Sequence, residues 1–336
     1  MQDLRQKVID HLHATVFDAI GYAPPKKALV VYDRRSTLSQ LLTDGYRAVL
    51  PEAVMMDFDS MTPGDAREAM NALSPGDLVV LVQSGSFRLN EFRFRLELFE
   101  RKLAVIEHPH LGRMPDSEAE TYIDALAYDK DYYRTVGPKL KALLDNAKRV
   151  VVACDGTELV YDGPLESTKL NIGDYTGMKN TGGQFPIGEV FTELKDLSQA
   201  NGQVKLFAFA DEHFRVILPP QPILVTIEKG LIVKTENATP EFQAVLDQIK
   251  SDEELWIREL GLGMNRALTR TRTLIDIGSY ERMCGVHLSL GAKHTIYTKT
   301  GFPKKTSHYH VDVFVDVKTV TVDGQVIFQD GAYRVS

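Results

Sequence analysis

Four of the nine histidines in this chain lie within residues 285–316, close to two aspartates. They are His287, His294, His308 and His310, and the aspartates are Asp312 and Asp316. Alternation in the run VHLSL places His287 on the strand face opposite its apolar neighbours. His310 and Asp312 in HVD share a strand face for the same reason. Imidazole and carboxylate are ligands for zinc, manganese, cobalt and ferrous iron. The pattern therefore predicts a metal site, whereas ordinary polar residues on a half-solvated sheet are the alternative.

Two glutamates lie beside flexible glycine backbone elsewhere in the second half of the chain. Glu189 follows a loop with glycine and proline in GGQFPIGEVFT, and Glu259 directly precedes the Gly-Leu-Gly bend of ELGLGMN. Glycine lets the backbone approach a bound ion closely, so both carboxylates are candidate ligands. Taken singly, each is also compatible with a solvated residue at a strand end.

Together these segments resemble the aminopeptidase T/aminopeptidase S metallopeptidases. The motifs GTELVYD, GEVFT, ELGLGMN, GVHLSLG, HVD and TVDGQVIFQDG occur in the order of that family. The resemblance covers residues 149–336, and the N-terminal half matches only as an α/β domain. It implies two divalent ions (zinc, cobalt or manganese). The implied ligands are Glu189, Glu259, His287, His310 and Asp312.

The same resemblance implies hydrolysis of a peptide or small amide with a free amino group, by a homodimer. A glutamate, preferably Glu259, would act as general base toward a metal-activated water. His294 or Tyr297 would stabilise the oxyanion. His294 occupies a position where the family has tyrosine, and the loop before Glu189 is longer than the family's GGEVFT.

Two other functions remain open. The dihydroxypyridine dioxygenases also resemble this chain, and that branch implies one ferrous iron held by His287, His310 and Asp312. The additional carboxylates Glu189 and Glu259 favour the hydrolase, because a single iron centre does not need five ligands. The altered loop before Glu189 is also compatible with a relative that binds metal without catalysis.

The N-terminal half has the rhythm of an α/β domain. A helix is expected over Asp3–Ile20, and apolar runs at 26–33, 53–59, 77–83 and 102–108 alternate with helical patterns. This alternation predicts a mostly parallel sheet. Asp33, residues 84–86 and residues 108–110 fall at the carboxyl ends of the strands, where such sheets bind ligands. His108-Pro109-His110 would line a cleft there or simply form a turn. Neither GxGxxG nor a P-loop is present.

From residue 149 the pattern becomes mostly β. RVVVAC and TELVYD flank Asp155-Gly156, which predicts a hairpin. One helix is expected after Thr239 as N-cap, with Pro240 at the first helical position and an apolar face. We therefore expect an α/β domain at 1–148, forming one wall of the cleft, and a β-rich α+β metal-binding domain at 149–336.

Composition narrows the class of protein. The chain has 336 residues with a formal net charge of −7, which argues against a nucleic-acid-binding scaffold. Its two cysteines form neither a CxxC motif nor a disulfide framework, so a reducing compartment is expected. The N-terminus lacks a signal-peptide pattern, and no apolar run approaches membrane-spanning length. These features predict a cytoplasmic protein with neither nucleic-acid nor membrane partners.

Overall fold

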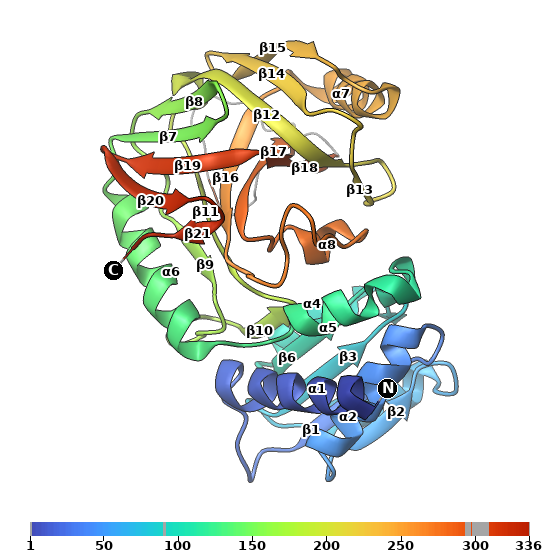
Figure 1. Ribbon diagram of the computed structural model, residues 1–336. Helices are drawn as coiled ribbons and strands as arrows, with labels where there is room; N and C mark the ends of the chain where they lie inside the picture. Colours follow the sequence, from blue (N-terminus) through green and yellow to red (C-terminus); the bar gives the residue numbers. More distant parts are fainter. Residues whose placement is uncertain (1, 90–91, 293–296, 298–308, 336) are drawn as a thin grey trace. The chain divides into compact units, whose positions relative to one another are not determined.

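The computed structural model describes residues 2–89, 92–292, 297 and 309–335. The chain divides into two compact units (Figure 1). The first unit comprises Met1–Tyr133 and Gly173–Ile187, and the second comprises Arg134–Ile172 and Gly188–Ser336. The boundary expected at residue 148 lies inside the second unit, between a helix that ends at Asp145 and a strand that begins at Arg149.

The first unit contains a five-stranded parallel sheet in the order β10-β6-β3-β1-β2. Its strands are β1 (Ala28–Tyr32), β2 (Val54–Asp57), β3 (Leu78–Val82), β6 (Ala104–His108) and β10 (Thr181–Gln184). Every residue of β3 is apolar and buried, as expected for a strand covered on both faces. Four of the strands confirm the predicted parallel sheet. The fifth, β10, was not predicted.

The helices of the first unit connect and cover these strands. They are α1 (Gln2–His13), the π-helical η1 (Ala14–Ala19), α2 (Thr37–Val49), α3 (Pro63–Asn71), α4 (Phe94–Glu100) and α5 (Ala119–Ala125), with short 3₁₀ turns η2 (Leu111–Arg113) and η3 (Asp116–Glu118) and a small ribbon of β4 (Arg88–Leu89) and β5 (Phe92–Arg93). Helix α1 packs against α2 and α5 through buried side chains such as Val8 and Leu12. The helix expected at the N-terminus is confirmed. Helix α6 (Lys130–Asp145) starts in the first unit and continues into the second.

The second unit is built on one antiparallel sheet of fourteen strands. Its main path runs β21-β20-β19-β7-β8-β12-β18-β17-β16-β11-β9, and β13, β14 and β15 attach through β12. The strands are β7 (Arg149–Cys154), β8 (Thr157–Asp162), β9 (Lys169–Asn171), β11 (Glu189–Glu193), β12 (Ala200–Ala210), β13 (Val216–Ile217), β14 (Ile223–Glu228), β15 (Leu231–Glu236), β16 (Ile257–Gly263), β17 (Gly285–Gly291), β18 (His310–Val315), β19 (Val317–Val322), β20 (Gln325–Gln329) and β21 (Ala332–Tyr333). The expected combination of an α/β part and a β-rich part is confirmed.

Short elements complete the second unit. The hairpin β7–β8 turns at Asp155-Gly156, where the glycine has a φ of +76°. Helix α7 (Pro240–Asp252) begins after Thr239, whose side chain accepts a hydrogen bond from the Phe242 amide. Its predicted apolar face is buried. The remaining elements are α8 (Ile277–Tyr280) and η4 (Leu197–Gln199).

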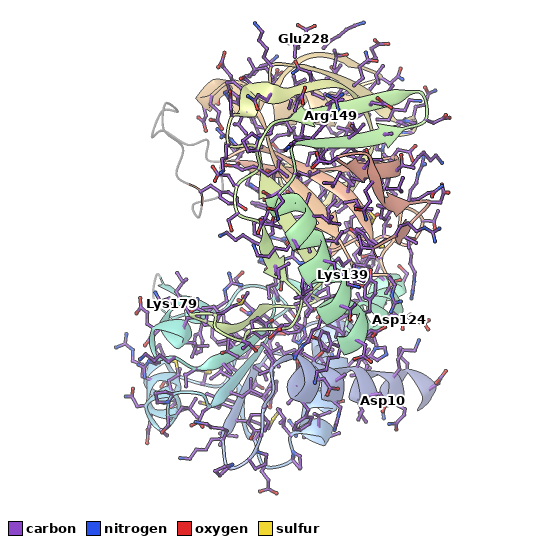
Figure 2. The ribbon with its side chains drawn as sticks, turned by 90° about the vertical axis from the view of Figure 1, so that its left-hand side faces the viewer. Asp10, Asp124, Lys139, Arg149, Lys179 and Glu228 are labelled. Atoms are coloured by element: carbon purple, nitrogen blue, oxygen red, sulfur yellow. The ribbon has the colours of Figure 1, made fainter. Side chains whose placement is uncertain are left out.

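Charged side chains lie on the outside of the second unit, as Lys139, Arg149 and Glu228 illustrate (Figure 2). Among the helices described, none combines the length and the apolar character that crossing a bilayer requires. The buried charged residues of the second unit are therefore the exceptions, and several of them lie on neighbouring strands.

Candidate metal centre

Four adjacent strands, β11, β16, β17 and β18, present polar side chains on one face of the second unit's sheet. In the antiparallel register Glu189 is opposite Gly263, and Gly261 is opposite His287. Because side chains alternate along a strand, Glu189, Glu259 and His287 point to the same side. We call this side the site face. The sequence predicted the alternation, and the sheet order brings the strands together.

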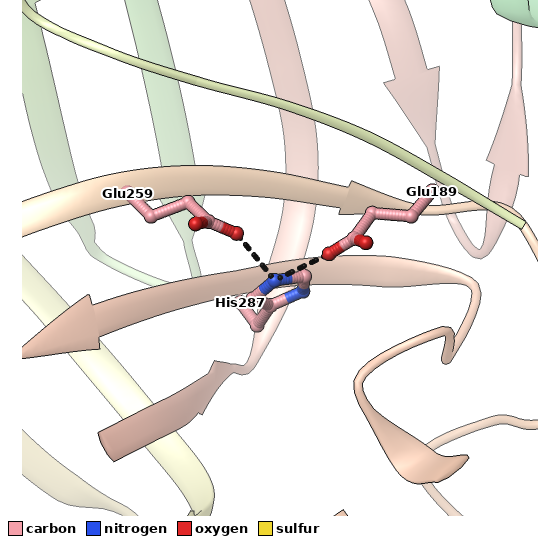
Figure 3. Close-up of side chains that lie close together, drawn as sticks. All are labelled: Glu189, Glu259 and His287. Atoms are coloured by element: carbon pink, nitrogen blue, oxygen red, sulfur yellow. Dashed lines mark hydrogen bonds and ion pairs between the residues drawn. The ribbon is translucent and has the colours of Figure 1, made fainter. Parts of the chain in front are cut away.

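The two glutamates converge on a single nitrogen of His287 (Figure 3). His287 Nε2 lies 3.1 Å from Glu189 Oε1 and 3.3 Å from Glu259 Oε1. All three side chains are buried, and their ligand atoms lie within 4.8 Å of one another. Burying two carboxylates is costly unless a cation or proton compensates them. This arrangement therefore suits a cation.

Two glycines in β16 make the close approach possible. A Cβ atom at Gly261 would lie 2.0 Å from His287 Nε2, so no side chain fits beneath the imidazole. A Cβ atom at Gly263 would lie 1.9 Å from the Met283 carbonyl oxygen. The Gly-Leu-Gly run, which was expected to form a bend, instead lies inside strand β16. Its glycines leave room for the imidazole ring at Gly261 and for neighbouring backbone at Gly263.

The backbone of Glu259 is held by a side chain on the next strand. Its N–H donates to Ser289 Oγ at 3.1 Å. The pairing of β16 with β17 shifts register between Ile257 and Leu260, so the regular ladder is interrupted at Glu259. The Ser289 hydroxyl therefore accepts the hydrogen bond from the Glu259 N–H where the backbone ladder is interrupted. This hydrogen bond positions Glu259 beside His287.

A buried arginine completes the group on the Glu189 side. Arg282 Nη1 lies 2.6 Å from Glu189 Oε2 and 2.6 Å from Glu281 Oε1. Arg282 is 7% exposed. No sequence pattern singles out Arg282, because a lone Glu-Arg pair before a strand normally lies in solvent. Glu189 thus uses one oxygen toward His287 and the other toward Arg282.

The charges in this group alter one another's proton affinities. Burial alone would lower the pKa of His287, but its hydrogen bonds to Glu189 and Glu259 raise that pKa well above its ordinary value. Burial alone would raise the pKa of Glu189, yet the Arg282 charge together with the hydrogen bond and charge of His287 outweighs it and lowers that pKa. The opposite shifts of these two pKa values show that the imidazole, the two glutamates and Arg282 interact as one group of charges.

His310 and Asp312 form a separate pair on β18. His310 Nε2 lies 3.2 Å from Asp312 Oδ1, and His310 Nδ1 is 3.1 Å from the Ala292 carbonyl oxygen. Asp312 is opposite Ser289 on the site face, next to His287, and is buried. His310 is 36% exposed at its side chain. The structure places this pair beside the three converging ligands, outside the 4.8 Å group.

The remaining predicted residues lie at one edge of the site or outside the described part of the chain. Tyr297 is buried, and its hydroxyl donates toward the carbonyl oxygens of Ser167 at 3.3 Å and Phe191 at 3.5 Å. Burial, with the nearby charge of Glu259, raises its pKa. His294 and His308 lie outside the described residues. The catalytic role expected for Tyr297 or His294 stays a prediction.

His108, at the end of β6 in the first unit, has a structural environment of its own. Its Nε2 is 2.7 Å from the Tyr46 hydroxyl, and its Nδ1 is 2.9 Å from the Tyr122 hydroxyl. Tyr122 donates to the Phe185 carbonyl oxygen at 3.2 Å. His108 is fully buried, which lowers its pKa to about 3. It is therefore a neutral core residue on β6 that links helices α2 and α5 and, through Tyr122, the loop that carries Phe185.

The donor set of Glu189, Glu259 and His287 fits a divalent metal ion. It is buried, rich in oxygen, and supplies one imidazole nitrogen, which are properties of zinc, cobalt and manganese sites. Gly261 leaves open the space next to the ligand nitrogen. Among the described residues, Glu189, Glu259 and His287 form the group of three or more possible metal ligands whose ligand atoms all lie within 4.8 Å of one another.

Comparison with known proteins supports the fold. No protein-family model matches the sequence, and neither does any curated protein sequence. The structure is similar to the solved structure of wild-type AmpT from Thermus thermophilus, with a TM-score of 0.60 and 14% sequence identity. The match covers 98% of this chain and 99% of AmpT. At this identity the similarity concerns the fold, and over its whole length the chain has the fold of AmpT.

Proposed function

We propose that this chain is a metal-dependent hydrolase of the aminopeptidase type, which releases an N-terminal amino acid or cleaves a related small amide. The observation that carries the proposal is the buried convergence of Glu189 and Glu259 on His287 Nε2. The fold shared with AmpT and the order of the C-terminal motifs support it.

In this proposal Glu189, Glu259 and His287 bind a divalent ion. His310 and Asp312 lie beside them as further candidate ligands. Such an ion, when bound, polarises a carbonyl group and lowers the pKa of water to about 7. Because all three ligand side chains are buried, solvent water does not compete with them for the ion. Their positions are set by Gly261 and by the Ser289 hydroxyl.

The chain's own groups then divide the work. Glu259 is the proposed general base, because its carboxylate lies beside the ligand nitrogen of His287, at 3.3 Å, and its backbone N–H is held by Ser289. It would take a proton from water and pass it to the leaving amine. Asp312 adds negative charge beside the ligands, which suits a substrate with a protonated amino group. Tyr297 or His294 is the proposed oxyanion partner.

The geometry favours the hydrolase over a ferrous-iron dioxygenase. A two-histidine, one-carboxylate site would use His287, His310 and Asp312. In the described structure His287 instead meets two glutamates, and His310 pairs with Asp312 apart from them. A carboxylate-rich set is suited to ions that do not change oxidation state.

The test begins with protein stripped by a chelator and then given zinc, cobalt or manganese. We expect renewed cleavage of an aminoacyl arylamide without oxygen or reductant. Glu259→Gln should lower the rate by about 10²–10⁴-fold, the usual contribution of a general base. Glu228→Gln, an exposed change on β14, is the matched control and should retain full activity.

The opposite outcome is equally definite. Oxygen consumption with a dihydroxylated pyridine and ferrous iron, together with inactivity on every amide tested, would reject the hydrolase. Stoichiometric metal binding with neither activity would instead point to a binding protein that lost catalysis.

A further inference from the structure

Arg282 occupies a place in the candidate metal centre that a simple ligand set does not explain. Its guanidinium lies 2.6 Å from Glu189 Oε2, while Glu189 Oε1 faces His287. The inference that follows rests on the proposed function, because it concerns how many ions the same site takes.

The position of Arg282 is fixed by backbone packing. Its carbonyl oxygen accepts a hydrogen bond from the Asn265 amide at 2.9 Å. Gly263, which is opposite Glu189 in the sheet, leaves room for the backbone of residues 282 and 283, since a Cβ atom there would lie 2.9 Å from the Arg282 carbonyl carbon. Strand β16 therefore makes room both for the Arg282 backbone, at Gly263, and for the His287 ring, at Gly261.

Glu189 has no second oxygen to spare for another ion. A carboxylate that bridges two ions through both of its oxygens offers one oxygen to each, and in this site Glu189 Oε2 is engaged with Arg282. The same Nη1 atom of Arg282 also lies 2.6 Å from Glu281 Oε1. A second cation next to Glu189 would have to displace a buried arginine and leave its charge without a partner, which is strongly unfavourable.

We infer that Arg282 stands in place of a second metal ion, so that the site binds a single divalent cation through Glu189, Glu259 and His287. This differs from the two ions that the sequence resemblance implies. The guanidinium is a permanent charge that keeps Glu189 oriented whether or not the metal is present.

The experiment counts metal ions per chain on the full-length protein. Chelator-treated protein is saturated with Mn²⁺, freed of unbound metal by gel filtration, and measured by mass spectrometry of the metal against protein concentration. We expect one ion in the wild type and in Arg282→Lys, and two in Arg282→Met. The electron paramagnetic resonance spectrum should change from that of an isolated Mn²⁺ to that of a coupled pair.

Arg258→Met is the matched control. Arg258 is another buried arginine on β16, paired with Glu253 and the Gly291 carbonyl oxygen, and its loss should leave the count at one. Far-UV circular dichroism checks that each variant is folded. If Arg282→Met does not fold, the wild-type count and spectrum decide the inference.

Each other outcome has a definite meaning. Two ions in the wild type would overturn the inference and leave the proposed hydrolase intact. One ion in folded Arg282→Met would also overturn it, because the guanidinium would not be what excludes the second ion. A folded wild type that binds none would reject the metal site itself, and with it the proposed function.

Discussion

Gly261 is the residue at which a side chain would collide with the imidazole of the candidate site. We expect Gly261→Ala to weaken binding of zinc or manganese by about 10–100-fold, the range seen when a ligand loses its positioning. The reason is the 2.0 Å separation between an added Cβ atom and His287 Nε2, which forces the ring to move. Isothermal titration calorimetry of chelator-treated protein measures the affinity.

Gly64→Ala provides the control for this glycine. Gly64 lies in helix α3 of the first unit, where the nearest atom to an added Cβ is 3.4 Å away. The change should leave metal affinity unchanged and raise the free energy of unfolding by up to about 1 kcal/mol, because alanine favours helix. Wild-type affinity in Gly261→Ala would mean that the imidazole is not held by this contact.

Glu189 and Arg282 are expected to depend on each other for stability. In metal-free protein Glu189→Gln should lower the free energy of unfolding by about 3 kcal/mol, because it leaves a buried guanidinium poorly compensated. Adding Arg282→Met to that variant should restore part of the loss. Urea unfolding of the two single variants and the double variant in the presence of chelator measures the coupling. Purely additive losses would show that the pair does not interact.

At the scale of elements, the pairing of β16 with β17 sets where Glu259 lies. Ser289→Ala removes the hydroxyl that accepts the Glu259 N–H and should lower the free energy of unfolding by about 1–3 kcal/mol, the cost of an unsatisfied buried donor. It should also weaken metal binding by about 10–100-fold, as expected for loss of a supporting hydrogen bond. Chemical denaturation and calorimetry measure the two effects.

The exposed Ser251, on helix α7, serves as the control for Ser289. Its hydroxyl donates to the Gln248 carbonyl oxygen at the surface. Ser251→Ala should change the free energy of unfolding by no more than about 0.5 kcal/mol and leave metal binding as it is. An equally small effect of Ser289→Ala would show that the Ser289 hydroxyl does not position Glu259.

The elements also show what the sequence could and could not predict. Alternation was enough for β17 and β18, because the apolar residues of VHLSL and HVDVFV fix which side His287 and Asp312 face. Arg282 was beyond reach, since its burial depends on Gly263 and on a strand more than ninety residues earlier that carries Glu189. Such contacts between distant segments leave no local pattern.

Strand β10 escaped prediction for a related reason. Its sequence, Thr181–Gln184, contains two glycines and none of the branched or aromatic residues other than threonine that mark strands. It pairs in parallel with β6, and a Cβ atom at Gly182 would lie 1.9 Å from the Val105 carbonyl oxygen. Glycine at position 182 allows the backbones of β10 and β6 to approach closely. In the sequence alone, however, a pair of glycines predicts a loop.

At the scale of the whole molecule, His108 should make stability depend on pH. Its folded pKa of about 3 lies below the ordinary value of about 6.5, so the unfolded chain takes up the proton first. The free energy of unfolding should therefore decrease as pH falls from about 6.5 toward 3. The loss attributable to this group is about 2 kcal/mol between pH 7 and pH 5.

Denaturant unfolding at the two pH values tests this dependence. His108→Gln should have a shallower dependence on pH than the wild type, whereas His213→Gln, at an exposed position, should not change it. Nitrogen NMR of the folded protein should show His108 neutral at pH 5 with its proton on Nδ1, since Tyr122 donates onward to Phe185. A charged ring at that pH would contradict the prediction.

Metal should stabilise the two units unequally. Because the ligands belong to β11, β16 and β17, saturating metal should slow amide hydrogen exchange in these strands and leave β1 and β3 of the first unit unchanged. Binding at 100 times the dissociation constant adds about 2.7 kcal/mol to the stability of the folded state. Exchange measured by mass spectrometry, with and without chelator, reads each strand separately. Equal protection of both units would argue against a site confined to the second.

The return of the chain to the first unit at Gly173–Ile187 has a consequence for biosynthesis. The ribosome delivers β1, β2, β3 and β6 well before β10, and β7, β8 and β9 of the other unit emerge in between. Until Gln184 has left the exit tunnel, the β6 edge is an unsatisfied template for foreign strands. A nascent chain stalled with Tyr133 just outside the tunnel should therefore be a better chaperone client than one stalled with Ile187 just outside it.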